Sequence, residues 1–356
     1  MQNRTNRPIF IVGSPRSGTS VLTWCLGQHP NIFVVDESTG IGELALALAV
    51  CYQTKMGLGR DSVWTAMNVQ RGEFIAAFGQ TINELILRHK VDLEKRRWEE
   101  TVGSNVAPSS FVTEQSSSCP KARWVDGTPV YSFHIYGLRK LFPDAQFIHI
   151  VRDVTSVVRS MLNFHRLGDV NLVANEQEAY DYWFRAVSAC LLAERAYGPE
   201  VVFRFQYSEL VNRPEASLRA LLNFLGEPYA PECLTPLREK INSSNVPADF
   251  KLGDPHSDPA VIELATRLYT QIETSPQPSE ISQIAAYKIE IEFNQRANYV
   301  ATLDRAYTTA HTEFTEARAR AERLANEIQR KKATIRALQA RRWRHKLRKF
   351  VFGQDA

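Results

Sequence analysis

The sequence predicts an α/β fold in which helices cover both faces of a parallel sheet, followed by a C-terminal α-helical coiled coil. Short β-branched apolar runs alternate with amphipathic segments, and such strand–loop–helix units recur along the chain. Strands that alternate with helices pair in parallel, because each crossover helix returns the chain to the same end of the sheet. A heptad pattern near the C-terminus indicates the coiled coil.

The first unit begins near the N-terminus. Residues 8–13 form a β-branched apolar run that stops at a glycine, and residues 19–28 have apolar side chains at helical spacing. This pattern predicts a strand, a loop and a helix. Helical patterning over residues 40–95 indicates a helical insert at about residues 40–120, within which the Ser- and Thr-rich stretch 104–120 is predicted to be a surface loop.

Two more units follow the insert. Residues 146–151 form an apolar run that leads into Arg152 and then into an amphipathic stretch, which predicts a strand and a helix. The third unit is a helix over residues 180–197, a strand over 201–205 and a helix over 214–225 that ends at a glycine. These units complete the predicted parallel sheet.

A Pro- and Ser-rich stretch marks the predicted end of this domain. We place the α/β domain at residues 1–273, a linker at 274–280, and a coiled coil with a basic tail at 281–356. Apolar residues repeat at heptad spacing over roughly six heptads, whereas a single helix folded back on the domain would need a wider apolar stripe. The predicted a positions are Phe293, Val300, Tyr307, Phe314, Ala321, Ile328 and Ile335, and the d positions are Arg296, Leu303, Ala310, Ala317, Leu324, Lys331 and Leu338.

Composition and charge limit the class of protein. The 356 residues are 44% hydrophobic and 23% charged, which is typical of a globular protein and excludes wholesale disorder. Residues 318–349 hold 13 Lys and Arg against two acidic residues, a net charge of +11, so the remainder of this +4 chain sums to −7. The basic character therefore belongs to the C-terminus and says nothing about the ligand of the main domain.

The basic tail leaves two interpretations open. Residues 343–352 combine aromatic side chains with cations, as an interfacial helix at an anionic membrane does, and a solvated end of the coil has the same composition. We expect no nucleic-acid partner, because the basic residues lie on an oligomerisation helix without a recognisable binding module.

The cysteines and the apolar runs indicate the cellular compartment of the protein. Five widely spaced cysteines form no C-x-x-C pair, and no histidine cluster has metal-ligand spacing, which favours a reducing compartment and no metal. No run reaches the ~18 apolar residues that a membrane span needs, and no signal peptide is visible. We expect a cytoplasmic protein, and peripheral contact of its basic tail with the inner membrane face stays open.

The strongest functional signal is the glycine-rich loop over residues 13–20, G-S-P-R-S-G-T-S, between the first strand and its helix. Glycines let successive backbone N–H groups point at one oxyanion, and the helix N-terminus adds its positive dipole end. The sheet is therefore P-loop-like and the loop binds a phosphate or sulfate group. A nucleoside triphosphatase would place a lysine where this loop has Thr19, which disfavours a typical ATPase.

The loop resembles that of the 3′-phosphoadenosine 5′-phosphosulfate (PAPS) dependent sulfotransferase family, which reads P-R-S-G-T followed by S or T. The resemblance implies that the 5′-phosphosulfate is bound by Pro15, Arg16, Ser17, Gly18, Thr19 and Ser20. A second family element, a strand followed by R-D and then a serine eight residues after the arginine, is matched by Arg152 and Ser160 and implies a 3′-phosphate site. Tyr207 matches a tyrosine near the adenine in tyrosylprotein sulfotransferases, and the resemblance spans roughly residues 8–230.

The resemblance also implies a catalytic base. In the tyrosylprotein branch, a glutamate that acts as base stands eight residues after the histidine of an H-P pair, which here is His29 and gives Glu37. Glu37 would take the acceptor proton, and Arg16 would stabilise the leaving phosphate. Asp36 is the alternative base, and capping of the next helix is the alternative role for both carboxylates.

One position departs from the family. Many relatives have a lysine where this chain has Gly127, so we expect Arg16, backbone amides, Lys121 or Arg123 to supply the missing charge. Histidines serve as the base in the cytosolic branch, which makes His134 and His149 further candidates, although a histidine inside a strand is more typical of a core.

These observations predict a PAPS-dependent sulfotransferase that acts, without a metal, on a hydroxyl of a carbohydrate or glycolipid. A P-loop small-molecule kinase, which needs Mg²⁺ and ATP, and a non-catalytic sulfotransferase-like coiled-coil scaffold remain alternatives. The coiled coil predicts a homo-oligomer, and its parallel or antiparallel orientation stays open.

Overall fold

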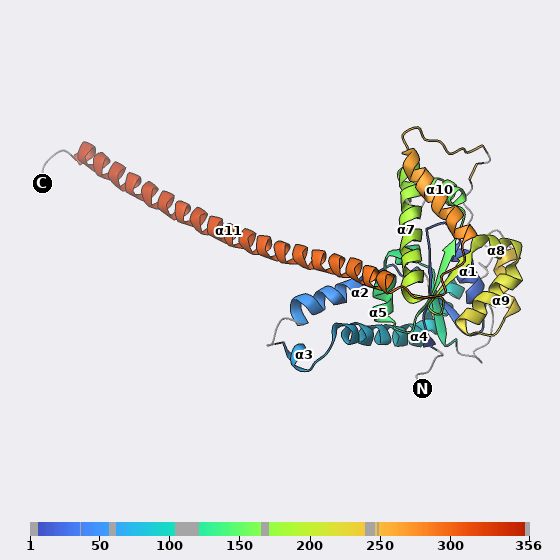
Figure 1. Ribbon diagram of the computed structural model, residues 1–356. Helices are drawn as coiled ribbons and strands as arrows, with labels where there is room; N and C mark the ends of the chain where they lie inside the picture. Colours follow the sequence, from blue (N-terminus) through green and yellow to red (C-terminus); the bar gives the residue numbers. More distant parts are fainter. Residues whose placement is uncertain are drawn as a thin grey trace. The chain divides into compact units, whose positions relative to one another are not determined.

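The computed structural model of the chain is drawn in Figure 1 and describes residues 6–35, 37–56, 62–103, 121–164, 171–238, 246–247 and 249–352. The chain divides into two compact units, Met1–Ala297 and Asn298–Ala356. The surface loop predicted over residues 104–120 lies outside the described residues.

The described residues form a five-stranded sheet in the order β2-β3-β1-β4-β5, and every pair of neighbours is parallel. The strands are β1 (Ile9–Val12), β2 (Ile32–Val35), β3 (Arg123–Asp126), β4 (Gln146–Val151) and β5 (Val202–Gln206). The α/β fold predicted from the sequence is confirmed. The chain leaves β1 toward β2 on one side and leaves β4 toward β5 on the other, so the crevice between β1 and β4 is a topological switch point.

Side chains of β1 alternate between two cores, because successive residues of a strand point to opposite faces. Ile9 and Ile11 pack with α1 (Thr19–Gly27) and α9 (Pro214–Leu225). Phe10 and Val12 lie in the cluster formed with α2 (Gly40–Cys51), α5 (Ile135–Leu141) and α7 (Glu176–Tyr197). Helices therefore cover both faces of the sheet, as Figure 1 shows.

The remaining elements of the first unit complete these layers. A third core joins α6 (Val154–Leu162) and α7 to α10 (Pro259–Thr274). The stretch predicted to be helical after the first unit contains α2, a π-helical turn η2 (Tyr52–Met56), α3 (Val63–Ala66) and α4 (Arg71–Gly103). Short elements η3 (Pro129–Phe133), α8 (Tyr207–Asn212) and η4 (Pro231–Arg238) follow β3, β5 and α9.

The last helix, α11 (Gln283–Phe352), has 70 residues, and its first turns belong to the first unit. Ala285 and Ile289 are buried in the core cluster of α5, and the ring centroid of Phe293 lies 5.0 Å from that of Tyr136. A residue that the heptad pattern assigns to the seam is therefore used in packing within the chain.

The Pro- and Ser-rich stretch between α10 and α11 lies along β5, one of the two edge strands of the described sheet. Gln277 accepts a hydrogen bond from the backbone N–H of Arg204 at 2.9 Å and donates one to the carbonyl of Val202 at 2.5 Å. An amide side chain thus satisfies strand groups that an uncovered edge would expose.

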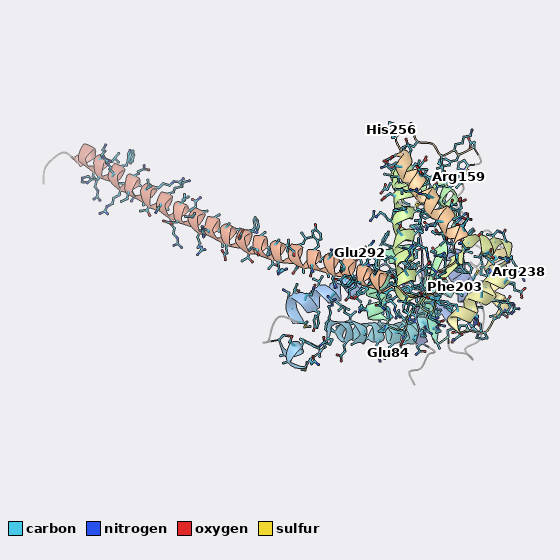
Figure 2. All side chains as sticks on the ribbon, in the orientation of Figure 1. Glu84, Arg159, Phe203, Arg238, His256 and Glu292 are labelled. Atoms are coloured by element: carbon cyan, nitrogen blue, oxygen red, sulfur yellow. The ribbon has the colours of Figure 1, made fainter. Side chains whose placement is uncertain are left out.

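The second unit is the remainder of α11. Every side chain described between residues 302 and 348 is exposed, and Figure 2 shows these side chains standing out around the helix. Across the described chain, no helix combines the length and the apolar character needed to cross a bilayer. The coiled coil stays a prediction.

Candidate active site

A cavity of about 670 Å³ lies at the C-terminal ends of the strands, within the ~300–1,000 Å³ typical of ligand sites. Every strand of the described sheet is followed by a residue that lines it: Arg16 after β1, Glu37 after β2, Thr128 after β3, Arg152 after β4 and Tyr207 after β5. The other predicted site residues on its wall are Pro15, Gly18, Thr19, Ser20 and Ser160. The structure therefore brings the separate motifs to one place.

Ser17 is the predicted residue that does not line this cavity. It is fully buried, and its hydroxyl oxygen has no hydrogen-bond partner among the described residues. Its side chain therefore lies behind the cavity wall, and Ser17 belongs to the site through the backbone of the loop.

The backbone of the loop requires its glycines. Gly13 has φ of 155°, and a Cβ there would lie 2.5 Å from the carbonyl oxygen of Ile150. Gly18 has φ of 103°, and a Cβ there would lie 2.6 Å from the ring of Tyr207. Arg16 also takes a left-handed conformation, with φ of 67°. The loop then enters α1, whose first backbone N–H groups carry partial positive charge.

Two arginines lie together on the cavity wall. Nε of Arg16 donates to Oγ of Ser160 at 3.1 Å, and Nη1 of Arg152 donates to the carbonyl oxygen of Arg16 at 3.1 Å. The two guanidinium carbons lie over the rings of Phe164 and Tyr207, 4.2 and 4.4 Å from the respective centroids. Aromatic faces thus orient both cations, which belong to the two motifs assigned to the 5′ and 3′ anionic groups.

The pKa of Arg16 reports the same proximity. Burial lowers this pKa, the positive charge of Arg152 lowers it further, and the negative charge of Glu37 partly offsets the two effects. An anion placed between the guanidinium groups would relieve their repulsion and could accept hydrogen bonds from both.

Glu37 is exposed at the cavity, and the residue after it is held from two sides. The hydroxyl of Ser38 donates to the carboxylate of Asp126, and the carbonyl oxygen of Ser38 accepts from the hydroxyl of Tyr131. The second carboxylate oxygen of Asp126 accepts from the backbone N–H of Thr128 at 3.0 Å, and burial raises the pKa of Asp126. Asp126 at the end of β3 and Tyr131 in η3 thereby fix the backbone that carries Glu37.

The described alternatives to Glu37 as catalytic base lie away from the main cavity. The N-cap of α2 is Thr39, so Glu37 is not the capping residue of that helix. Asp36 lies outside the described residues. His149 is fully buried, with Nδ1 2.5 Å from the carboxylate of Glu194, and His134 lines a separate cavity of about 160 Å³. Neither histidine lies on the wall of the main cavity.

The structure gives a steric reason for Gly127. A Cβ at this position would lie 2.1 Å from Oγ1 of Thr23 on α1, so a lysine would require Thr23 to move. The expectation that Lys121 or Arg123 replaces the family lysine is wrong. Both lie at or before the start of β3, away from the cavity, and Arg123 is buried against Glu227, 2.9 Å from its carboxylate.

Sequence reasoning missed part of the wall. Ser156 precedes Ser160 by one helical turn on α6, so helical periodicity could have found it. Phe164 follows α6 and Tyr182 lies on α7, and no local pattern marks either as a cavity residue. Further wall residues are Val21, Thr39, Pro129, Val130, Leu172, Leu210, Val211, Pro214, Pro236, Leu237 and Val246.

Comparisons with known proteins agree with these motifs. A family model described as "Sulfotransferase family" matches residues 8–231. Protein-tyrosine sulfotransferase A of Caenorhabditis elegans is 25% identical over 236 residues, which are 64% of this chain and 52% of that protein. The omega-hydroxy-beta-dihydromenaquinone-9 sulfotransferase Stf3 of Mycobacterium bovis is 32% identical over 106 residues, 28% of this chain and 27% of that protein.

A solved structure of sulfotransferase STF9 from Mycobacterium avium aligns over 78% of this chain and 79% of that chain, at 19% identity and a TM-score of 0.41. The chain spans about half the length of the curated protein-tyrosine sulfotransferases from Caenorhabditis elegans, Danio rerio and Gallus gallus that it matches.

Proposed function

The chain belongs to the sulfotransferase family, and we propose that it transfers a sulfuryl group from PAPS to a hydroxyl of a carbohydrate or glycolipid. One observation carries the choice of donor: the Arg152 and Ser160 pair lies in hydrogen-bond contact with Arg16 of the glycine-rich loop. A nucleotide with anionic groups at both the 5′ and the 3′ position suits two adjoining cationic sites, whereas ATP carries its phosphates at one end.

The residues present fit this donor. The loop offers backbone N–H groups and the guanidinium of Arg16 to the 5′-phosphosulfate, and Arg152 with Ser160 faces the 3′-phosphate. The ring of Tyr207 lies beside the loop at Gly18 and supplies a flat apolar surface for the adenine. When bound, PAPS supplies a sulfuryl group attached to a phosphate that can leave.

Glu37 and Arg16 divide the chemistry. Glu37 takes the proton of the acceptor hydroxyl as the acceptor oxygen forms its bond to sulfur. Arg16 and the loop amides stabilise the negative charge that collects on the phosphate oxygen when its bond to sulfur breaks. The products are a sulfate ester and 3′-phosphoadenosine 5′-phosphate (PAP), and the proton remains on Glu37 until solvent removes it.

The lining supports a neutral hydroxylated acceptor. Besides Glu37 and the arginines, the wall offers hydroxyl groups of Thr39, Thr128 and Tyr182 and apolar side chains. The names of two relatives contain a tyrosine and an omega-hydroxy compound, which are hydroxyl acceptors. Hydroxyl groups beside apolar side chains suit the edges and faces of a sugar ring.

The activity test uses radiolabelled PAPS, a panel of neutral glycans and glycolipids, and the release of PAP as readout. We expect Glu37→Gln to lower kcat by about 10²–10⁴-fold without weakening PAP binding, because amide replaces carboxylate at the same place. Glu43→Gln, an exposed carboxylate on α2 that does not line the cavity, is the matched control. Phosphate transfer from ATP–Mg²⁺ would establish the kinase instead, and PAP binding without any turnover would establish the scaffold.

A further inference from the structure

The part of α11 between Val300 and Leu338 carries an apolar stripe whose side chains are exposed. Its large side chains occupy a and d positions of the heptad repeat, three, four, seven or ten residues apart, which keeps them on one line along the helix. Their exposed fractions run from 36% to 70%, unusual for so many apolar side chains in one row. They are Val300, Leu303, Tyr307, Phe314, Leu324, Ile328, Ile335 and Leu338.

The stripe has defined ends. Before it, Phe293 packs on Tyr136 within the first unit. After it, the heptad pattern places Arg342 and His345 at the next a and d positions, where polar side chains replace apolar ones. The surface in need of a partner is therefore the segment 300–338.

We propose that this stripe is the contact surface of a parallel, in-register dimer of this chain. The residues at its core favour two parallel helices, because β-branched residues at a with leucine at d is the pattern of parallel two-stranded coiled coils. Ile328 and Ile335 stand at a, and Leu324 and Leu338 stand at d.

Charges beside the stripe fit the same arrangement. In a parallel in-register pair, each g residue faces the e residue of the following heptad on the other helix. Glu313 and Glu327 stand at g, and Arg318 and Lys332 stand at e five residues later. Glu313 thus faces Arg318 of the second copy, Glu327 faces Lys332 of the second copy, and two-fold symmetry repeats both contacts. Antiparallel helices set g against g and e against e, and so form neither contact.

Among the described residues of the stripe, one cation stands at a seam position, and a carboxylate on the same helix lies beside it. Nζ of Lys331, at a d position, lies 2.7 Å from the carboxylate of Glu327 on the same helix. The aliphatic stem of Lys331 can stay in the seam while the charge leaves it. A polar residue at one seam position fixes register at a cost in stability. The three seam alanines, Ala310, Ala317 and Ala321, bury little surface, so the dimer is of moderate strength.

The first test is sedimentation equilibrium of the full chain at micromolar concentration. We expect a dimer, and we expect Leu324→Lys with Ile328→Lys to raise its Kd by at least ~100-fold because two charges enter each half of the seam. Asn326→Lys with Gln329→Lys makes the same change of charge in the same turns, outside the stripe, and should leave the dimer intact. Unchanged helical circular dichroism would show that both variants keep α11 folded.

Orientation is tested with two single-cysteine additions, Ala310→Cys and Lys331→Cys, both at d positions and three heptads apart. In the parallel dimer each site meets its own copy, so both variants should form covalent dimers on mild oxidation, while the wild-type chain does not. Antiparallel helices can bring only one of these sites, roughly 30 Å apart, onto its own copy. Cross-linking of one site alone would therefore overturn the proposal.

A monomer, or an assembly larger than two copies, would also overturn it. Vesicles of phosphatidylglycerol test whether the stripe binds a membrane instead. If the chain is a monomer and binds these vesicles through Leu324 and Ile328, the stripe is a membrane-binding surface. These measurements require no turnover, so their outcome is independent of sulfuryl transfer.

Discussion

Two arginines at opposite ends of the same sheet show how this fold separates structure from binding. Arg123 opens β3, is 1% exposed, and donates to the carboxylate of Glu227, to Oε1 of Gln146 and to two backbone carbonyls at 2.8–2.9 Å. Arg152 follows β4, donates to the carbonyl of Arg16, and has no carboxylate within ion-pair distance among the described residues. An arginine at one end of the sheet thus makes four hydrogen bonds within the fold, and an arginine at the other end can bind an anion.

The difference follows from the direction of the strands. Parallel strands gather their C-terminal ends at one edge of the sheet, where loops diverge at the switch point and leave room for a ligand. At the N-terminal edge, neighbouring elements of the protein surround the strand ends. A buried charge there must therefore be paired with groups of the protein itself. Position in the sheet therefore predicts the effect of substitution.

The largest effect on the free energy of unfolding is expected at Arg123. Arg123→Met should lower the free energy of unfolding by about 3–5 kcal/mol, because Glu227 loses the partner of a buried ion pair. Urea unfolding measures the loss. PAP binding by the folded fraction should persist. A loss of unfolding free energy below ~1 kcal/mol would show that the ion pair of Arg123 with Glu227 contributes little to stability.

A smaller, ligand-linked effect is expected at the other end. Arg152→Met should change the free energy of unfolding of the free protein by less than ~1 kcal/mol, since no ion pair is broken. At PAP concentrations of 100 times Kd the wild type gains about 2.7 kcal/mol, and the variant should gain almost none. Arg159→Met, on α6 at a residue labelled in Figure 2 and outside the cavity wall, is the control that should keep the full gain.

The hydroxyl that holds the Glu37 segment should have a still smaller effect, on catalysis alone. Tyr131→Phe removes the donor to the carbonyl of Ser38, and we expect kcat to fall about tenfold, or ~1.4 kcal/mol, with unchanged PAP affinity. Tyr287→Phe, exposed on α11, is the matched control. A parallel loss of PAP affinity would show that Tyr131 supports the whole cavity rather than the position of Glu37.

The smallest effect concerns pH. Burial by itself raises the pKa of Glu194, but the hydrogen bonds and positive charges of His149 and Arg204 outweigh it and leave the pKa below its usual 4.5. A carboxyl whose pKa is lower in the folded than in the unfolded state stabilises the fold above its unfolded pKa, and this contribution is lost as pH falls through the folded value. The free energy of unfolding should therefore fall below about pH 4.5, and less steeply in Glu194→Gln. Equal slopes in urea titrations of the two proteins would contradict this assignment.

Local patterns predicted the parts of the fold that are locally determined. The strands β1, β4 and β5 and the helices α1, α6, α7 and α9 lie where apolar runs and helical spacing place them. The strand β3 was not expected, because Arg123 and Asp126 at its two ends are polar, and their burial depends on Glu227 and Ser38, which are distant in sequence. The strand β2, of four residues, was missed as well.

The site shows the same division. Motif residues that are contiguous in sequence, such as those of the loop, were predicted together because the backbone makes them one unit. The positions of Phe164 and Tyr182 depend on how α6 and α7 pack, and the space at Gly127 is set by Thr23 on another element. No sequence pattern carries that information.

The most direct test of the account is a thermal-shift titration of the wild-type chain with PAP, ATP–Mg²⁺ and AMP in parallel. Each ligand that binds only the folded state raises Tm by mass action. The account predicts that PAP alone raises Tm, because Arg152 and Ser160 recognise its 3′-phosphate beside the 5′ site. A larger shift with ATP–Mg²⁺, or no shift with PAP, would contradict it.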